Sequence, residues 1–316
     1  MSQKIKIDDI KEFKTVELPD RIKMNCFLVL KDGRFAFANT TELMIYIYDP
    51  KNDFHCDIKI DPISDCKEKD PRYVPLKFTQ IDEDTIHVFT KFNASIYKLK
   101  KDSYEEIVHF GFSIPHDEFT ETDGNHDTFI HGIAPLSKRR LACYGNNWFD
   151  IRNADIDIMY RGVKNLVFGD CIMNAFQLKG KEKLVVHTNK RINFFDLNTY
   201  SCVQTSMIKA SNVVQIDDDR LLVQKSGEVF IFNYVTSIKE ASFRHFNFNT
   251  CEAFQYIGDK QFLCGAINMA LLDLETMKFT TKEVEHSQNC RVIKDIGNNT
   301  LITWYYDQPG FTVWKY

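Results

Sequence analysis

Residues 180–208 read GKEKLVVHTNKRINFFDLNTYSCVQTSMI, and this stretch is the most informative one about the fold. A polar turn precedes the apolar run KLVVHT, a short polar loop follows it, and a second apolar run, INFFDL, leads into a third, more polar run. Short runs rich in β-branched and aromatic residues, bounded by polar turn residues, are typical of strands joined by hairpins. Together with the apolar run AFQL just before it, the stretch predicts four consecutive strands.

The same order of runs and turns recurs along the whole chain of 316 residues. The strand that follows the polar turn is expected to begin at Arg34, Thr85, Arg140, Lys183, Arg220, Gln261 and Thr300, at intervals of 51, 55, 43, 37, 41 and 39 residues. Blades of a β-propeller repeat every 40–45 residues or so. The sequence therefore predicts one all-β domain over residues 1–316, a seven-bladed β-propeller with four-stranded antiparallel blades at about 24–60, 76–110, 129–163, 172–208, 211–246, 251–284 and 289–316.

The last repeat holds only three expected strands before Tyr316, whereas an extra segment, Lys11–Leu18, precedes the first repeat. This segment (KEFKTVEL) alternates apolar and polar residues, as a half-buried strand does. We expect it to complete the last blade and close the ring, because closure removes the exposed sheet edges that invite aggregation. The third repeat is the least regular one, so six blades are the alternative.

Two of the expected third strands end in similar motifs, Phe194–Thr199 (FFDLNT) and Leu271–Thr276 (LLDLET). These motifs resemble the WD-repeat family, and the resemblance covers nearly the whole chain. The Trp-Asp and Gly-His dipeptides that are usual in the family are missing, and Trp314 is the nearest remnant of the former. The resemblance implies a degenerate WD-repeat β-propeller that serves as a platform for protein assembly.

Composition bears on the compartment and on the classes of partner. The formal net charge is −4 and shows no basic footprint of a nucleic-acid-binding protein, and no apolar run approaches the roughly 20 residues that span a bilayer. The nine cysteines are scattered and form no C-x-x-C pair, which favours a reducing compartment. With no signal peptide at the start, we expect a cytoplasmic or nuclear protein that is not secreted and does not insert into membranes. Its oligomeric state stays open.

Two insertions, 61–75 and 111–128, lengthen the first two intervals and are expected on one face of the propeller. Loops of more than about 12–15 residues in compact domains are usually functional or disordered. The second insertion combines carboxylates with aromatic side chains, which anchor interfaces when exposed. It predicts a site for a protein partner, possibly one with a basic patch, formed by Phe112, Ile114, His116, Asp117, Glu118, Phe119, Glu121, Asp123 and Trp148. A solvated acidic loop and a metal site are the alternatives, and core packing is the alternative for Trp148.

The sequence carries no recognisable motif for catalysis or cofactor binding. The chain contains no G-x-S-x-G elbow and no glycine-rich phosphate loop, and its His and Asp spacings match no zinc or calcium signature. His187 lies in an apolar run and is interpreted as a buried structural histidine. We therefore expect no catalytic, cofactor-binding or metal residues. The leading function is a non-enzymatic interaction scaffold or adaptor subunit of a larger complex, with a metal-assisted propeller hydrolase and a peptide-reading substrate receptor as alternatives.

Overall fold

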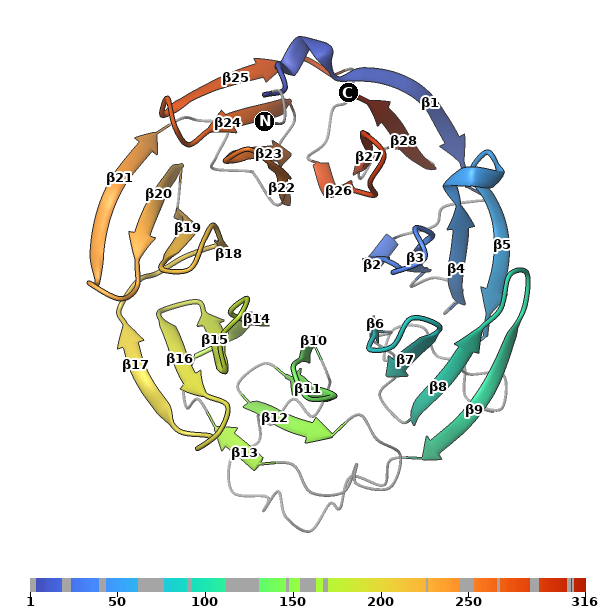
Figure 1. Ribbon diagram of the computed structural model, residues 1–316, viewed down its shortest axis with the longest axis horizontal. Coiled ribbons are helices and arrows are strands. Elements are labelled where there is room, and N and C mark those ends of the chain that lie inside the picture. The colour runs from blue at the N-terminus through green and yellow to red at the C-terminus, as the bar shows by residue number, and fades with distance from the viewer. Residues whose placement is uncertain are drawn as a thin grey trace. The chain divides into compact units, whose positions relative to one another are not determined.

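In the computed structural model, seven four-stranded antiparallel sheets account for nearly all of the regular structure in the described residues (Figure 1). The structure describes residues 4–18, 24–39, 44–61, 77–89, 93–111, 131–145, 148–153, 163–166, 170–225, 227–244, 253–265, 268–284, 290–305, 308 and 310–316. Two short 3-10 helices, η1 (Ile7–Asp9) and η2 (Pro50–Asn52), accompany the sheets. The protein is thus an all-β, seven-bladed β-propeller, and the prediction of its fold is confirmed.

Residues 25–209 form one compact unit, which holds four of the sheets. Each sheet is ordered as in the chain: β2 (Met24–Val29), β3 (Phe35–Asn39), β4 (Met44–Asp49) and β5 (His55–Ile60); β6 (Lys77–Gln80), β7 (Thr85–Phe89), β8 (Asn93–Leu99) and β9 (Tyr104–Gly111); β10 (Gly132–Leu136), β11 (Arg140–Tyr144), β12 (Trp148–Asn153) and β13 (Val163–Leu166); β14 (Ile172–Gln177), β15 (Lys183–Thr188), β16 (Ile192–Asp196) and β17 (Cys202–Ser206).

Residues 1–24 and 210–316 form the second unit, which holds the other three sheets. They are β18 (Asn212–Gln215), β19 (Arg220–Lys225), β20 (Glu228–Asn233) and β21 (Ile238–Arg244); β22 (Ala253–Gly258), β23 (Gln261–Gly265), β24 (Met269–Asp273) and β25 (Lys278–Lys282); and β26 (Cys290–Asp295), β27 (Thr300–Tyr305), β28 (Gly310–Lys315) and β1 (Lys11–Glu17).

The second strand of each sheet begins at the residue expected from the sequence in six sheets, and one residue later, at Phe35, in the first. Middle strands such as β3 and β15 are buried along almost their entire length. Because both faces of these strands are covered, clusters of buried apolar side chains lie between neighbouring sheets of each unit. The regular third repeat in sheet β10–β13 rules out the six-bladed alternative.

Aspartate and asparagine side chains shape the turns between the third and fourth strands. Asp196 and Asp273 each accept hydrogen bonds from the backbone N–H groups two and three residues further on, and Asn233 does the same. Each turn then ends in a residue of left-handed backbone, such as Tyr200 with φ 55°. Such side-chain mimicry of a backbone turn is the reason that Asx residues dominate turns. It explains the Asp-Leu-x-Thr motifs of the sequence.

Strand β1 pairs antiparallel with β28, from Lys11↔Lys315 to Glu17↔Gly310, and supplies the fourth strand of the last sheet (Figure 1). The sequence predicted this pairing. The segment before β1 was not predicted: Ile5 exchanges two hydrogen bonds with the side-chain amide of Gln261, and Ile7 and Ile10 are buried beside the sheet β22–β25. The N-terminal segment therefore joins two neighbouring sheets of its unit.

Trp314, singled out in the sequence, lies in the last sheet. The indole N–H of Trp314 on β28 donates to Thr303 Oγ1 on β27 over 2.8 Å, and both side chains are buried. Among the described residues, no helix is long and apolar enough to cross a membrane.

Gly310 on β28 lies so close to β1 that a Cβ atom there would overlap the carbonyl oxygen of Val16. We expect Gly310→Ala to force β1 out of register and to lower the free energy of unfolding by about 2–4 kcal/mol. Urea unfolding followed by tryptophan fluorescence measures the loss. Lys11→Ala, at an exposed position of β1, is the control. Equal stability of the Gly310 variant and the wild type would show that β1 pairing contributes little.

Glutamine side chains clamp neighbouring sheets together at their first turns. In Gln80, at the end of β6, Oε1 accepts from Lys31 N at 2.8 Å and Nε2 donates to Glu83 O at 2.8 Å. Gln177, at the end of β14, bonds in the same way to Ser137 N and Lys181 O. Each amide thus satisfies one backbone group in its own sheet and one in the preceding sheet.

Replacing Gln80 with Leu would leave a backbone donor and a backbone acceptor without these partners, and an unsatisfied buried polar group costs about 1–3 kcal/mol. We expect Gln80→Leu to lower the free energy of unfolding by about 2 kcal/mol, measured by urea denaturation. The matched control is Gln255→Leu, because the Gln255 amide donates only to the adjacent Tyr256 carbonyl at the surface. Similar losses in both variants would contradict a clamp.

Candidate functional site

Most of the predicted partner-binding site lies outside the described residues. This applies to both insertions, and so to Phe112, Ile114, His116, Asp117, Glu118, Phe119, Glu121 and Asp123. The loop site therefore stays a prediction.

Trp148 is the one residue of that predicted site that the structure describes. It begins β12, is partly buried, and packs against a buried cluster of Phe89, Leu141 and Cys143 between the sheets β6–β9 and β10–β13. These contacts favour the packing role that was the alternative for Trp148.

Two other residues weighed in the sequence are core residues. His187 on β15 has no exposed surface, in agreement with its interpretation as a buried structural histidine. Tyr305, at the end of β27, is likewise fully buried. In the part of the chain that the structure describes, no three His, Cys, Asp or Glu side chains are arranged to hold a metal ion.

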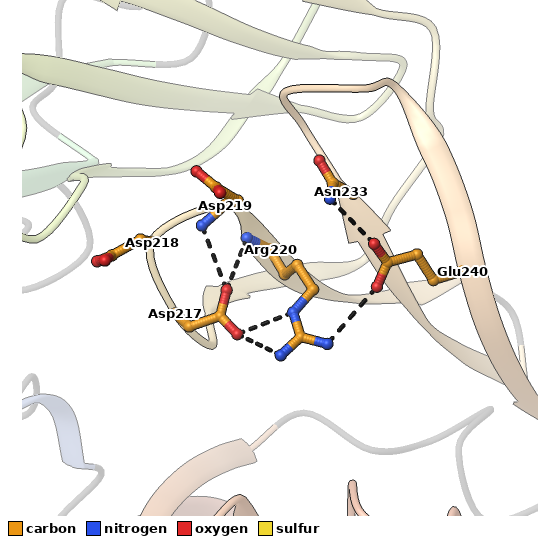
Figure 2. A pocket seen from close by; sticks show the side chains of 6 residues that line it. All are labelled: Asp217, Asp218, Asp219, Arg220, Asn233 and Glu240. Atoms are coloured by element: carbon orange, nitrogen blue, oxygen red, sulfur yellow. Dashed lines mark hydrogen bonds and ion pairs between the residues drawn. The ribbon is translucent and has the colours of Figure 1, made fainter.

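An acidic depression of about 400 Å³ lies on the sheet β18–β21, and Figure 2 shows its lining. Asp217, Asp218, Asp219 and Arg220 come from the turn between β18 and β19, whereas Asn233 ends β20 and Glu240 lies on β21. The fold brings them together because antiparallel pairing places the start of β19 opposite the end of β20, and the end of β20 opposite the start of β21.

Arg220 is the centre of the polar network in this depression (Figure 2). Its Nε donates to Asp217 Oδ2 over 2.8 Å, and its Nη1 lies 3.6 Å from Glu240 Oε2. Asn233 Nδ2 donates to the other Glu240 oxygen over 2.9 Å. The guanidinium contacts two of the four carboxyl groups that line the depression, which therefore keeps a surplus of negative charge.

The same contacts shift the ionisation of the central pair. Partial burial by itself would raise the pKa of Asp217, but hydrogen bonds from Arg220 and from the Asp219 N–H outweigh it, and the pKa lies below its ordinary value. The hydrogen bond to Asp217 raises the pKa of Arg220. Both groups are therefore charged at neutral pH, and the depression can attract ammonium or guanidinium groups. In the sequence, this run of three aspartates predicts only a turn.

Similarity to known proteins is found at the level of the fold. No family model matches the chain, and no curated protein matches it. Among solved structures, the β-propeller domain of Myceliophteria thermophila Cps50 (Swd1) is similar, with a TM-score of 0.71 and 10% sequence identity, over 97% of this chain and 99% of that domain. The similarity places the chain in the class of β-propeller proteins. At this identity it shows the fold alone.

Asp217 gives a pH test of the network. A carboxylate whose pKa is depressed in the folded state stabilises that state above its unfolded pKa and loses the effect as pH falls through the folded pKa. We expect Asp217→Asn to cost about 0.5–1 kcal/mol at pH 7, since the pair is substantially exposed, and almost nothing at pH 2.5. Urea unfolding at both values measures the difference, with the exposed Asp102→Asn as control. A cost that does not fall with pH would contradict the ionic contribution.

Proposed function

We propose that this protein is a non-enzymatic interaction scaffold, an adaptor built on a degenerate WD-repeat propeller. The observation that carries the proposal is the way the turns are held. Side-chain amides such as those of Gln80 and Gln177, and Asx side chains such as Asp196, fix the turn backbones, while charged side chains at the same turns remain exposed. A rigid surface of this kind reduces the entropic cost of binding. The step from fold to role also rests on analogy.

The alternatives gain less from the described residues. A metal-assisted hydrolase needs converging ligands, and the described part of the chain offers no such group. A peptide-reading receptor would differ from the scaffold only in taking a short linear segment. We further propose a cytoplasmic or nuclear location, supported by the seven described cysteines, none of which forms a disulfide.

We propose the second insertion as the main partner site, with Trp148 at the start of β12 in the sheet that follows it. Its carboxylates favour a partner with a basic patch and an affinity that falls as salt rises.

Replacing residues 112–128 by a Gly-Ser linker tests this site. We expect the variant to lose at least one partner in affinity purification from native cells, and that partner should bind the purified wild-type protein in a salt-dependent manner. Replacing residues 62–75 in the same way is the matched control. Recovery of every partner in undiminished yield by the 112–128 variant would refute the site.

A further inference from the structure

The first turns of the sheets β10–β13 and β14–β17 lie side by side and carry an excess of positive charge. Stretches 138–140 and 179–182 hold five cationic side chains and one carboxylate, in a chain whose formal net charge is −4. Four of the cations, Lys138, Arg139, Lys179 and Lys181, are exposed or partly exposed and are named here the basic turn pair. The fifth cation is Arg140.

The carboxylate of Glu182, in the second turn, binds side chains of the first turn. It accepts from the Ser137 hydroxyl at 2.7 Å and from Arg140 Nη2 at 2.6 Å, and it lies 3.5 Å from Lys138 Nζ. Ser137 lowers the pKa of Glu182 most, and Arg140 and Lys138 lower it further, against the effect of burial. Glu182 therefore offsets only part of the positive charge, and the two stretches keep more cationic than acidic side chains.

Two partly buried side chains join the first turn of β10–β13 to the sheet β14–β17. Gln177 accepts from Ser137 N in one turn and donates to Lys181 O in the other, over 2.7 Å for the second bond. Arg140 reaches across to the carbonyl of Leu197, over 2.6 Å. The cations are thus presented on a preorganised backbone rather than on independent loops.

The backbone of the first turn has a form that other first turns of the protein share. Lys138 and Arg139 have φ values of 55° and 52°, in the left-handed region that favours Asn and Gly. The turn at Asn298 and Asn299 and the turn at Asp259 and Lys260 are left-handed at both positions as well. The turn backbone therefore does not itself require two cationic side chains, and the charge of Lys138 and Arg139 is a separate feature of this surface.

We propose that the basic turn pair docks an acidic protein segment, rich in Asp and Glu. Lysine ammonium groups and the fork of Arg139 fit carboxylates, and Arg139 already pairs with a carboxylate, that of Asp82 in the preceding sheet. A long polyanion such as nucleic acid fits less well. It would extend beyond the basic turn pair, where the carboxylates of Asp82 and Glu182 and the net negative charge of the chain repel it.

This proposal rests on the scaffold function and adds to it a surface opposite in charge to the second insertion. The two can fail separately, because the insertion is tested with native partners and the basic turn pair with a synthetic peptide.

The test uses the full chain and a fluorescein-labelled 12-residue peptide in which Glu and Asp alternate with Gly and Ser, with binding followed by fluorescence anisotropy at 50 mM and 150 mM NaCl. Replacing the left-handed turn residues by the preferred ones, in the double variant Lys138→Asn with Arg139→Gly, should weaken binding by about 5- to 10-fold at 50 mM salt. The same variant should not lower the midpoint of thermal unfolding, because the new residues suit the turn.

Two control variants separate the causes. Asp259→Asn with Lys260→Gly changes a turn of the same backbone type on β22–β23, and Lys51→Gln with Lys209→Gln removes two exposed positive charges elsewhere. Both should bind the peptide within about twofold of the wild type. Any of three results would overturn the proposal: no peptide binding at 50 mM salt, equal weakening in the charge-matched control, or tighter binding of a 12-nucleotide single-stranded DNA or of anionic lipid vesicles than of the peptide.

Discussion

The pairing of β1 with β28 is the contact on which the last sheet depends. Strand β28 carries Phe311, Val313 and Trp314, all buried, and without β1 its outer edge would present unpaired backbone groups. The same N-terminal segment continues to the neighbouring sheet through Ile5 and Gln261. Residues near the start of the chain and residues beyond 210 are thereby held in one compact unit, by strand pairing in one sheet and by backbone-to-side-chain hydrogen bonds to the other.

The middle strands are buried on both faces, so the backbone N–H and C=O groups at their ends have little access to water. These groups must find hydrogen-bond partners within their own turn or in the neighbouring sheet. The glutamine clamps and the Asx turns meet this requirement, and they leave the exposed tips of the turns free to vary in charge. The acidic depression at Asp217 and the basic turn pair are two outcomes of that freedom on turns of the same kind.

The parts of this fold that could be predicted from sequence are those set by local chemistry. Alternation, turn residues and the repeat interval located the strands, and the alternating segment Lys11–Leu18 identified the strand that completes the last sheet. The clamp at Gln80 could not be predicted, because a glutamine at a strand end has no local pattern that reveals a bond to another sheet. Nor could the packing of Ile7 and Ile10, since a single turn of 3-10 helix carries no periodic signal. The predicted loop site depends on residues 112–123, which lie outside the described residues, while Trp148 is placed by its contacts with Phe89 and Leu141.

The propeller fold tolerates many different amino-acid sequences, so most of its residues carry little information about function. A chain with 10% identity to another propeller domain superimposes on it with a TM-score of 0.71, because buried strands need only alternation and volume, and turns need only the right backbone chemistry. Residues that follow those rules, such as Asn298 and Asn299, are explained by the fold. Residues that depart from them, such as Lys138 and Arg139, are not. Such departures are informative, because the turn backbone does not itself call for a lysine or an arginine.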